Sequence, residues 1–525
     1  MKKELVFEEL TAEQKIGLTV TAFLWGKNDI DYVLELIRKR ALGCVWITPT
    51  NKHRDELMKL IKDTADYPIL IMCDAESGID GHFIGRHNAL ACTGSEELAY
   101  TFGRVTGALA AKLGYNVICD PVLDMVKDNC CCGGTVRSMG SDKYKVTALA
   151  KAEARGLHDG GVLTVAKHYP GTTESGKYND SHMSEATSAM TKEELLEYNL
   201  YPYLELFKDN LIDGIMVGHK RFVNIDPDYP SSLSPKLTSF IRELGFDGFL
   251  MTDALNMMGV VAKFGREGSI GLSVSNGIDL SLPFTDSTSF AYEATYDFYK
   301  NGTLTDERLD DAVRKVLFTM SKVNKLTSPP ELTEEDFERF DRINTDTVFA
   351  KCDEGLTASL DTNGRYYFVI LTETSMDISN RGKVAVDTFS NAFFDPIAVA
   401  DKLEELFPNS KVGSISEYPS AIEIKRLFDN TLGYETVFIT YYQTQPYVGV
   451  ECFTSRITSL MRAMQVTDRI STVLHFGNPF VLEDLPHVPR LLIGTISKRN
   501  VECGIEVLAG KRLAKGVLTY DVDLK

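Results

Sequence analysis

The stretch that decides the fold is VLTVAKHYPG, residues 162–171. Its first five residues are almost continuously apolar, as expected of a strand buried on both faces of a parallel sheet. A lysine and a histidine follow at once, and a Pro-Gly pair then opens a polar loop. The stretch predicts a buried strand with titratable groups at its carboxyl end.

Other short apolar runs repeat this pattern between about residue 40 and residue 285. They are residues 43–47, 69–73, 116–119, 214–218, 248–252 and 279–282. Amphipathic stretches with a helical period, such as residues 95–113 and 143–159, separate them. Alternation of strands and helices over this length predicts a parallel α/β fold.

The ends of the runs distinguish a closed barrel from an open sheet. Titratable residues stand there repeatedly, namely Asp74, Asp120, Lys167, His168, His219 and Asp253. In a (β/α)8 barrel the carboxyl ends of all strands form the active-site rim. An open doubly wound sheet would concentrate its site at one switch point. We therefore expect a (β/α)8 TIM-like barrel, in which seven strands are recognisable and the first is not.

A second domain is expected after a change of composition. Residues 326–346 contain two prolines and a charged run, which predicts a linker leading into a helix. A further αβ alternation follows, with strand candidates at residues 366–371, 411–415, 436–440, 470–475 and 490–496. We expect a barrel at 1–325, a linker at 326–346 and a smaller α/β sandwich domain at 347–525.

Composition excludes some partners. The 525 residues contain 56 Lys plus Arg and 74 Asp plus Glu, giving a net charge of −18, which argues against nucleic acid or an anionic membrane. No secretory signal or bilayer-spanning run is visible. Ten scattered cysteines fit reduced thiols, so we expect a cytoplasmic protein. The triplet Cys130–Cys132 has no second Cys/His pair at ligand spacing, which favours loop thiols over zinc.

Asp253 directly follows the run at residues 248–252 and would point into the mouth of a barrel. It suits a nucleophile. The alternative is a helix N-cap, because Asp is a favoured cap and residues 254–258 could start a helix.

The segment Asp180-Ser181-His182 offers a second pair of groups. With one residue between them in an extended segment, the two side chains face the same way. Asp180 could then accept a proton from one ring nitrogen of His182, as an orienting carboxylate does for a general acid/base. The alternative is an ordinary Asx turn with a surface histidine.

Lys167 and His168 offer hydrogen-bond donors for sugar hydroxyls at one strand end. The alternative is a buried lysine paired with a carboxylate such as Asp74, and both can hold at once. The chain lacks the P-loop, HExxH, GxSxG and GxGxxG motifs, so nucleotide binding, zincin proteolysis and α/β-hydrolase chemistry lose their usual support.

With these motifs in place, the chain resembles glycoside hydrolase family 3, and more closely its bacterial β-N-acetylglucosaminidase branch of two-domain type. The resemblance covers most of the chain. It rests on Asp74-Ala75-Glu76-Ser77-Gly78, Asp120-Pro121-Val122-Leu123-Asp124, Arg137-Ser138-Met139-Gly140-Ser141, KHYPG, the Asp180–His182 loop and Thr252-Asp253.

The resemblance implies roles for these residues. Asp253 matches the nucleophile, His182 the general acid/base and Asp180 its partner. The positions that bind the terminal sugar match Asp74, Arg137, Lys167 and His168. No metal or organic cofactor is expected. The implied activity is a retaining, exo-acting β-N-acetylhexosaminidase that releases terminal N-acetylglucosamine from oligosaccharides or peptidoglycan fragments by double displacement.

Two departures from the branch bear on sugar preference. Thr172 and Thr173 stand where the family often has His-Gly, and His82 stands near a position that usually supplies an arginine. The alternatives left open are a β-N-acetylglucosaminide phosphorylase, a family 3 β-glucosidase or β-xylosidase, and a barrel that only binds sugar. The oligomeric state is not determined by the sequence.

Overall fold

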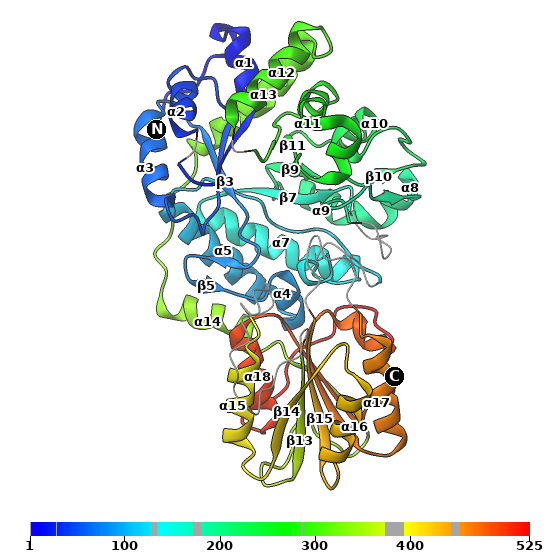
Figure 1. Cartoon of the computed structure of the whole chain (residues 1–525). Helices are drawn as coiled ribbons and strands as arrows, with labels where there is room; N and C mark the ends of the chain where they lie inside the picture. Colours follow the sequence, from blue (N-terminus) through cyan, green and yellow to red (C-terminus); the bar gives the residue numbers. More distant parts are fainter. Residues whose placement is uncertain are drawn as a thin grey trace. The chain divides into compact units, whose positions relative to one another are not determined.

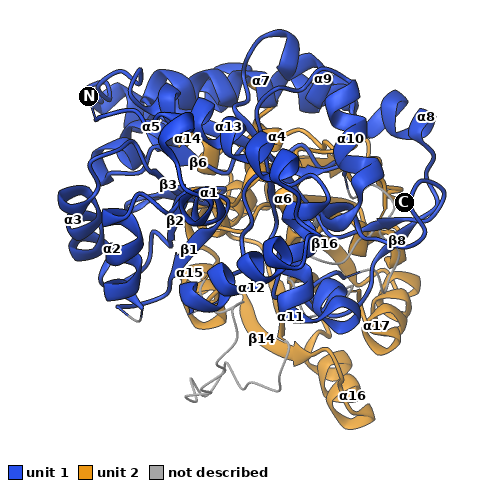
Figure 2. Ribbon diagram, turned by 90° about the horizontal axis from the view of Figure 1, so that it is seen from above, with its two compact units in different colours: residues 1–83, 96–125, 142–340 blue, residues 84–95, 126–141, 341–525 orange. Residues whose placement is uncertain are grey.

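The computed structural model describes residues 2–27, 29–128, 134–171, 180–285, 287–372, 393–442 and 452–525. Cys130–Cys132, Thr172 and Thr173 lie outside the described residues. Contacts between Cα atoms divide the chain into two compact units, coloured separately in Figure 2. Unit 1 comprises residues 1–83, 96–125 and 142–340; unit 2 comprises residues 84–95, 126–141 and 341–525.

Unit 1 is built on a sheet of seven parallel strands whose spatial order follows their order along the chain. Figure 1 labels β3, β7, β9 and β11 of this sheet. Their residues are buried throughout, as the apolar runs predict. The strands are β1 (Thr21–Leu24), β2 (Cys44–Ile47), β3 (Leu70–Cys73), β6 (Val117–Ile118), β7 (Leu163–Tyr169), β9 (Gly214–Val217) and β11 (Phe249–Thr252).

Residues 279–282 close this sheet into a barrel. Leu280 forms a parallel bridge with Met251 of β11, and Ser281 forms one with Val20, next to β1. The amide of Thr21 donates a hydrogen bond to the carbonyl of Ser281 at 3.0 Å. The expected (β/α)8 barrel is therefore confirmed, and β1 is the strand that the sequence did not reveal.

Helices alternate with the barrel strands, and two small sheets tie loops together at the rim. The helices are α1 (Ala12–Leu18), α2 (Ile30–Arg38), α3 (Arg54–Thr64), α5 (Glu96–Leu113), α7 (Lys143–Gly160), α8 (Lys192–Glu194), α9 (Tyr201–Lys208), α10 (Pro235–Glu243), α11 (Met258–Ser275), α12 (Thr288–Lys300) and α13 (Asp306–Val323). The small sheets pair β4 (Gly78–Ile79) with β5 (His82–Phe83), and β8 (Thr187–Ser188) with β10 (Arg221–Phe222).

Side-chain caps explain where most of these helices begin. Asp142 accepts hydrogen bonds from the amides of Tyr144 and Lys145 at the start of α7, and Thr305 does the same for α13. Helix α11, like α2, α3 and α9, begins without a side-chain cap, and the residue before it is Met257. The amides of its first turn therefore need other acceptors.

Unit 2 is an α/β sandwich around a six-stranded sheet of order β12-β17-β16-β15-β13-β14. Among the strand pairs of this sheet in the described part of the chain, the edge pair β12–β17 is antiparallel and the others are parallel. The strands are β12 (Phe349–Cys352), β13 (Tyr366–Thr372), β14 (Lys411–Ser416), β15 (Glu435–Tyr442), β16 (Ile470–Gly477) and β17 (Arg490–Gly494). The helices are α4 (His87–Thr93), α6 (Gly134–Arg137), α15 (Pro396–Leu406), α16 (Ala421–Asn430), α17 (Ser455–Val466) and α18 (Lys498–Leu508).

Both faces of the unit 2 sheet carry a hydrophobic core. Phe368 and Ile370 of β13 belong to one buried cluster, whereas Val369 and Leu371 belong to another. Successive side chains of a strand point to opposite faces, so each cluster lies on one face of the sheet. The predicted sandwich is confirmed.

The contact-based units differ from the predicted division at residues 325 and 347. Residues 84–95 and 126–141 precede the predicted linker but belong to unit 2. Their contacts explain this grouping: the amide of Ser141 bonds the carbonyl of Thr519 at 3.0 Å, and the hydroxyl of Tyr520 bonds the carbonyl of Ser138 at 2.8 Å. The predicted linker itself contains a helix, α14 (Glu334–Thr345).

Within the described residues, no helix is both long and apolar enough to cross a membrane.

Candidate active site

Six of the seven predicted site residues lie in unit 1, at or just beyond the carboxyl ends of three barrel strands. Asp74 follows β3, and Asp253 follows β11. Lys167 and His168 are among the last three residues of β7. Asp180 and His182 lie in the connection after β7. The parallel strands therefore direct these groups to one rim.

Lys167 is a fully buried cation held by two carboxylates. Its Nζ lies 2.5 Å from Asp74 Oδ1 and 2.8 Å from Glu76 Oε1. Glu76 is buried, while the side chain of Asp74 is 51% exposed. Asp74 therefore has an ordered carboxylate that also faces solvent, and such a group can accept hydrogen bonds from sugar hydroxyls. The alternative from the sequence, a buried Lys167 paired with a carboxylate such as Asp74, describes the contacts of Lys167 correctly.

His168 is fixed between two aspartates. Its Nδ1 lies 2.6 Å from Asp124 Oδ2, and since a carboxylate only accepts, Nδ1 donates this bond. The opposite nitrogen, Nε2, lies 3.8 Å from Asp253 Oδ2. Asp124 and His168 are both buried. Asp124 thus sets the orientation in which the ring faces Asp253.

Asp253 is reachable from solvent and stays ionised. Its side chain is 23% exposed, and Oδ1 accepts a hydrogen bond from the Ala254 amide at 2.7 Å. Burial alone would raise the pKa of this carboxyl, but the charge of His168, the largest opposing influence, and the Ala254 hydrogen bond hold the pKa well below its ordinary value. A carboxylate with these surroundings is available as a nucleophile near neutral pH.

The interpretation of Asp253 as a helix N-cap is wrong. Helix α11 begins at Met258, and its N-cap position is Met257. The amide of Asp253 itself bonds the carbonyl of Val217 at 2.9 Å, which continues the pairing of β11 with β9. The carboxylate is therefore placed by the barrel and does not serve to cap a helix.

His219 supports the backbone next to Asp253. Its Nε2 lies 3.0 Å from the Ala254 carbonyl, which can only accept, and its Nδ1 lies 2.7 Å from Ser232 Oγ. Burial, the largest influence, lowers the pKa of His219. The ring is therefore neutral, with its proton on Nε2, and its Nδ1 accepts a hydrogen bond from the Ser232 hydroxyl.

Asp180 and His182 form the predicted pair. His182 Nδ1 lies 2.8 Å from Asp180 Oδ1, and the same oxygen accepts the His182 amide at 2.9 Å. Asp180 is buried, whereas the His182 side chain is 18% exposed. Nδ1 donates to the carboxylate, which leaves Nε2 as the nitrogen that can exchange a proton with a substrate. The charge of His182 also contributes to the lowered pKa of Asp253, so the two groups lie within electrostatic reach.

Two residues singled out in the sequence belong to other elements. Arg137 ends α6, which is part of unit 2. His82 lies on the β4–β5 hairpin after Asp74, where its ring stacks on Phe337 with centroids 4.4 Å apart. His82 is therefore part of an aromatic contact with α14.

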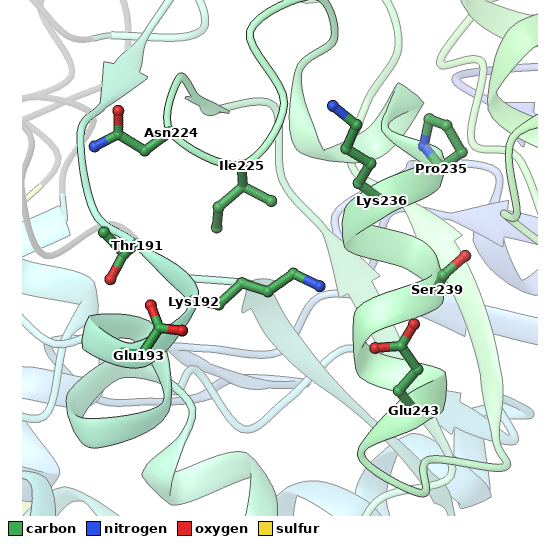
Figure 3. Close-up of a pocket in the computed structure, with 9 residues that line it drawn as sticks. All are labelled: Thr191, Lys192, Glu193, Asn224, Ile225, Pro235, Lys236, Ser239 and Glu243. Carbon is green, nitrogen blue, oxygen red and sulfur yellow. The ribbon is translucent and has the colours of Figure 1, made fainter.

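A pocket of about 630 Å³ lies beside α8 and α10, away from these groups. Figure 3 labels its nine lining residues, and none of them is a predicted site residue. Lys192 extends across it toward α10, with its Nζ 4.3 Å from the centre of the Phe240 ring. Two lysines and two glutamates line this pocket, so it has no dominant charge.

The family model described as "Glycosyl hydrolase family 3 N terminal domain" matches residues 14–319. The chain belongs to glycoside hydrolase family 3. The matched range contains all seven predicted site residues and covers more than half of this family 3 chain. The family resemblance expected from the motifs is thereby confirmed.

Curated relatives are modestly similar. A beta-N-acetylglucosaminidase/beta-glucosidase from Cellulomonas fimi is 25% identical over 331 residues, which cover 59% of this chain and 57% of that protein. This family 3 chain thus matches little more than half the length of that relative. A beta-hexosaminidase from Tolumonas auensis is 28% identical over 262 residues, which cover 47% of this chain and 77% of that protein.

Solved structures share the two-unit fold. A family 3 beta-N-acetylglucosaminidase from Paenibacillus sp. FPU-7 has a TM-score of 0.79 at 23% identity, covering 98% of this chain and 100% of that one. The beta-glucoside phosphorylase BglX has a TM-score of 0.80 at 23% identity, covering 98% of this chain and 95% of that one. At this identity the matches establish the fold of this family 3 chain.

Sequence reasoning did not assign roles to Glu76, Asp124 or His219. All three belong to quoted motifs or strand ends, but their partners are distant in sequence: Asp124 lies 44 positions before His168. The available signal was their position, since each follows a barrel strand. The positions of the strand ends therefore indicated which residues gather at the site, but not which of these residues pair with one another.

Proposed function

We propose that this chain is a retaining, exo-acting β-N-acetylhexosaminidase that releases terminal β-linked N-acetylglucosamine from oligosaccharides or peptidoglycan fragments. The observation that carries the proposal is the pairing of His182 with Asp180 at 2.8 Å within electrostatic reach of the ionised Asp253. Family membership and the names of relatives such as the Tolumonas beta-hexosaminidase support the substrate class.

In the first step, Asp253 attacks the anomeric carbon as the bond from this carbon to the leaving oxygen breaks. His182 gives the proton on Nε2 to that oxygen, so the leaving sugar departs as a neutral alcohol. A covalent glycosyl ester forms on Asp253. Its lowered pKa keeps Asp253 ionised before attack, so no proton has to be removed from the nucleophile.

In the second step, His182 acts as a base. Nε2 takes a proton from water while the water oxygen attacks the anomeric carbon, and the ester bond to Asp253 breaks. Two inversions restore the β configuration. Asp180 accepts the Nδ1 proton throughout, which fixes the tautomer and stabilises the cationic ring that forms in this step.

Asp74, Lys167 and His168 hold the hydroxyls of one terminal sugar, and Arg137 joins them through the family match. Lys167 is buried and pairs with Asp74 and Glu76, so it orders the carboxylates that accept hydrogen bonds from the sugar. A compact set of donors and acceptors for one ring makes the enzyme exo-acting. The stack of His82 on Phe337 assigns this histidine a supporting position.

Phosphorolysis is the second candidate, and one observation favours it. The acid/base is an imidazole, whereas a carboxylate 4 Å from a phosphate charge would cost about 4 kcal/mol at an effective dielectric constant of about 20. Phosphate could therefore replace water in the second step. BglX, which has the same fold, is named a beta-glucoside phosphorylase.

The test is turnover of an aryl N-acetyl-β-glucosaminide and of the matching glucoside, each with and without phosphate. The proposal predicts a preference for the N-acetyl sugar, free N-acetylglucosamine as product and no dependence on phosphate. A sugar 1-phosphate as the main product would establish the phosphorylase instead. Equal efficiency on the glucoside would leave only a family 3 glycosidase.

The dyad is tested by the dependence on leaving group. His182→Ala and Asp180→Ala should lower kcat/KM about 10² to 10⁴-fold for a poor leaving group, the usual contribution of general acid catalysis. Dinitrophenolate leaves without a proton, so kcat/KM for the dinitrophenyl glycoside should stay near that of the unaltered enzyme. Equal losses on both substrates would show that the loop only positions the sugar.

A further inference from the structure

The start of helix α11 follows one proposed reacting group, Asp253, along the chain and is hydrogen-bonded to the loop that carries the other, His182. The helix begins at Met258, only five positions after Asp253, and its preceding residue, Met257, provides no side-chain cap. The first amides of a helix have no partner inside the helix. In most helices Ser, Thr, Asp or Asn would supply one. In α11 the acceptors come from the loop that carries His182.

Two backbone hydrogen bonds make this connection. The amide of Gly259 donates to the carbonyl of Ser181 at 2.8 Å, and the amide of Met258 donates to the carbonyl of His182 at 3.3 Å. The loop is itself a tight turn, because the Asp180 carbonyl accepts the amides of Met183 and Ser184 at 3.0 and 2.9 Å. Residues 180–184 therefore dock as one piece on the first turn of α11.

Gly259 permits this docking by having no side chain. A Cβ at this position would lie 2.8 Å from the carbonyl oxygens of both Ser181 and Ser184, and 3.2 Å from Ser181 Cα. These are backbone atoms, so the contact could be relieved only by moving the loop. Space, not an unusual backbone angle, excludes a side chain here, because Gly259 lies within the regular helix.

The same helix turn is anchored to the barrel through the residues before it. The amide of Asp253 bonds Val217 of β9, and the amide of Leu255 bonds the carbonyl of Leu282 at 3.0 Å in the closing segment. Asp253 and the first turn of α11 are thus held in one short, fixed stretch of chain. A loop docked on that turn is positioned relative to Asp253.

We propose that the first turn of α11, through Met258 and Gly259, places the Asp180–His182 pair against Asp253; this docking site is called the seat below. Gly259 is then a positioning residue for proton transfer. The inference rests on the proposed function. The seat sets where His182 Nε2 meets the leaving oxygen and leaves the sugar pocket unchanged. Its loss therefore affects the steps that need a proton from His182 and spares those that do not.

The test compares two seat variants with a matched control. Gly259→Ala adds the Cβ that meets the loop. Met258→Pro removes the amide that bonds His182, at the first helical position, where proline is well tolerated. Gly268→Ala makes the same chemical change later in α11, where, among the described residues outside the helix's own backbone, a Cβ would meet Phe264 Cβ at an ordinary 3.9 Å.

Each variant is assayed with a methoxyphenyl and a dinitrophenyl N-acetyl-β-glucosaminide, and inhibition by N-acetylglucosamine is measured in parallel. Misplacement by about 1 Å costs roughly 100-fold, so Gly259→Ala should lower kcat/KM about 10- to 100-fold on the methoxyphenyl substrate. On the dinitrophenyl substrate the change should stay within about threefold. Met258→Pro should show the same split with a smaller loss, while Gly268→Ala and the inhibition constants should not change.

The seat is refuted if both Gly259→Ala and Met258→Pro leave the methoxyphenyl rate unchanged, if both substrates lose equally in the folded variants, or if Gly268→Ala shows the same loss. Met258→Pro decides the matter if Gly259→Ala does not fold. His182→Ala separates this outcome from failure of the proposed function. A leaving-group split in His182→Ala without one in the seat variants removes only the seat, and no split in His182→Ala removes the acid/base assignment itself.

Discussion

Replacing Asp124 should weaken catalysis indirectly. Asp124 orients His168, and His168 in turn faces Asp253. The Asp124 carboxylate accepts the His168 Nδ1 proton at 2.6 Å, and both side chains are buried. His168 Nε2, on the other side of the ring, lies 3.8 Å from Asp253. In Asp124→Ala the ring loses its fixed orientation and leaves a buried donor without its acceptor.

The size of the effect follows from the strength of this bond. A hydrogen bond to a charged group is worth about 1.5–3 kcal/mol, and about 1.4 kcal/mol is a factor of ten in rate. Asp124→Ala should therefore lower kcat/KM about 10- to 150-fold. Asp124→Asn keeps an oxygen acceptor but removes the charge, and since charge-assisted bonds are roughly twice as strong as neutral ones, about half of the bond energy is lost and kcat/KM should fall about 3- to 12-fold.

The assay is kcat/KM on an aryl N-acetyl-β-glucosaminide, with the melting temperature of each variant measured alongside. Asp247→Asn is the matched control, because this carboxylate is 93% exposed and pairs with Lys315 at the surface. Its kcat/KM should not change. Unchanged kinetics in the folded Asp124→Ala variant, or an equal loss in Asp124→Asn and Asp124→Ala, would contradict the role given to this hydrogen bond.

Three further outcomes are expected. Asp253→Ala should lower turnover by several orders of magnitude with an unchanged circular dichroism spectrum. Glu76→Gln removes one of the two carboxylates on Lys167, and steady-state kinetics should show a raised KM because the sugar-binding cation is less well fixed. Asp213, which pairs with His158 and Lys322 and has a pKa of about 2, stabilises the fold by about 2–3 kcal/mol above its unfolded pKa of about 4. Urea unfolding should show this difference between the protein and Asp213→Asn at pH 7, and the difference should shrink as the pH falls from about 4 to 2.

The barrel was predictable because its strands are short apolar runs that end on titratable residues. The predicted runs at residues 69–73 and 248–252 agree with β3 and β11 to within a residue. Strand β1 was missed because only two residues separate it from α1, so no turn signal marks its start. Residues 84–95 could not be assigned to unit 2 from sequence, since that grouping depends on contacts with distant residues such as Val517.

The site was predictable where its pairs are local in sequence. Asp180 and His182 are two positions apart and pair as predicted, but they do so in a tight turn, where Asp180 Oδ1 also accepts the His182 amide, and not in the extended segment that the prediction assumed. Asp124 and His168 are 44 positions apart, and the seat on Gly259 lies 78 positions beyond Ser181. Such pairs are created by barrel closure, which brings the ends of successive strands together, and a single sequence does not specify which end meets which.

Covalent trapping tests the central claim most directly. A 5-fluoro N-acetylglucosaminyl fluoride slows both steps but leaves the ester intermediate long-lived, so the enzyme should gain the mass of one fluorosugar. Peptide mass spectrometry should place that mass on Asp253. A label on any other residue, or turnover of this reagent with inversion and no label, would contradict the assignment of Asp253 as the nucleophile of a double displacement.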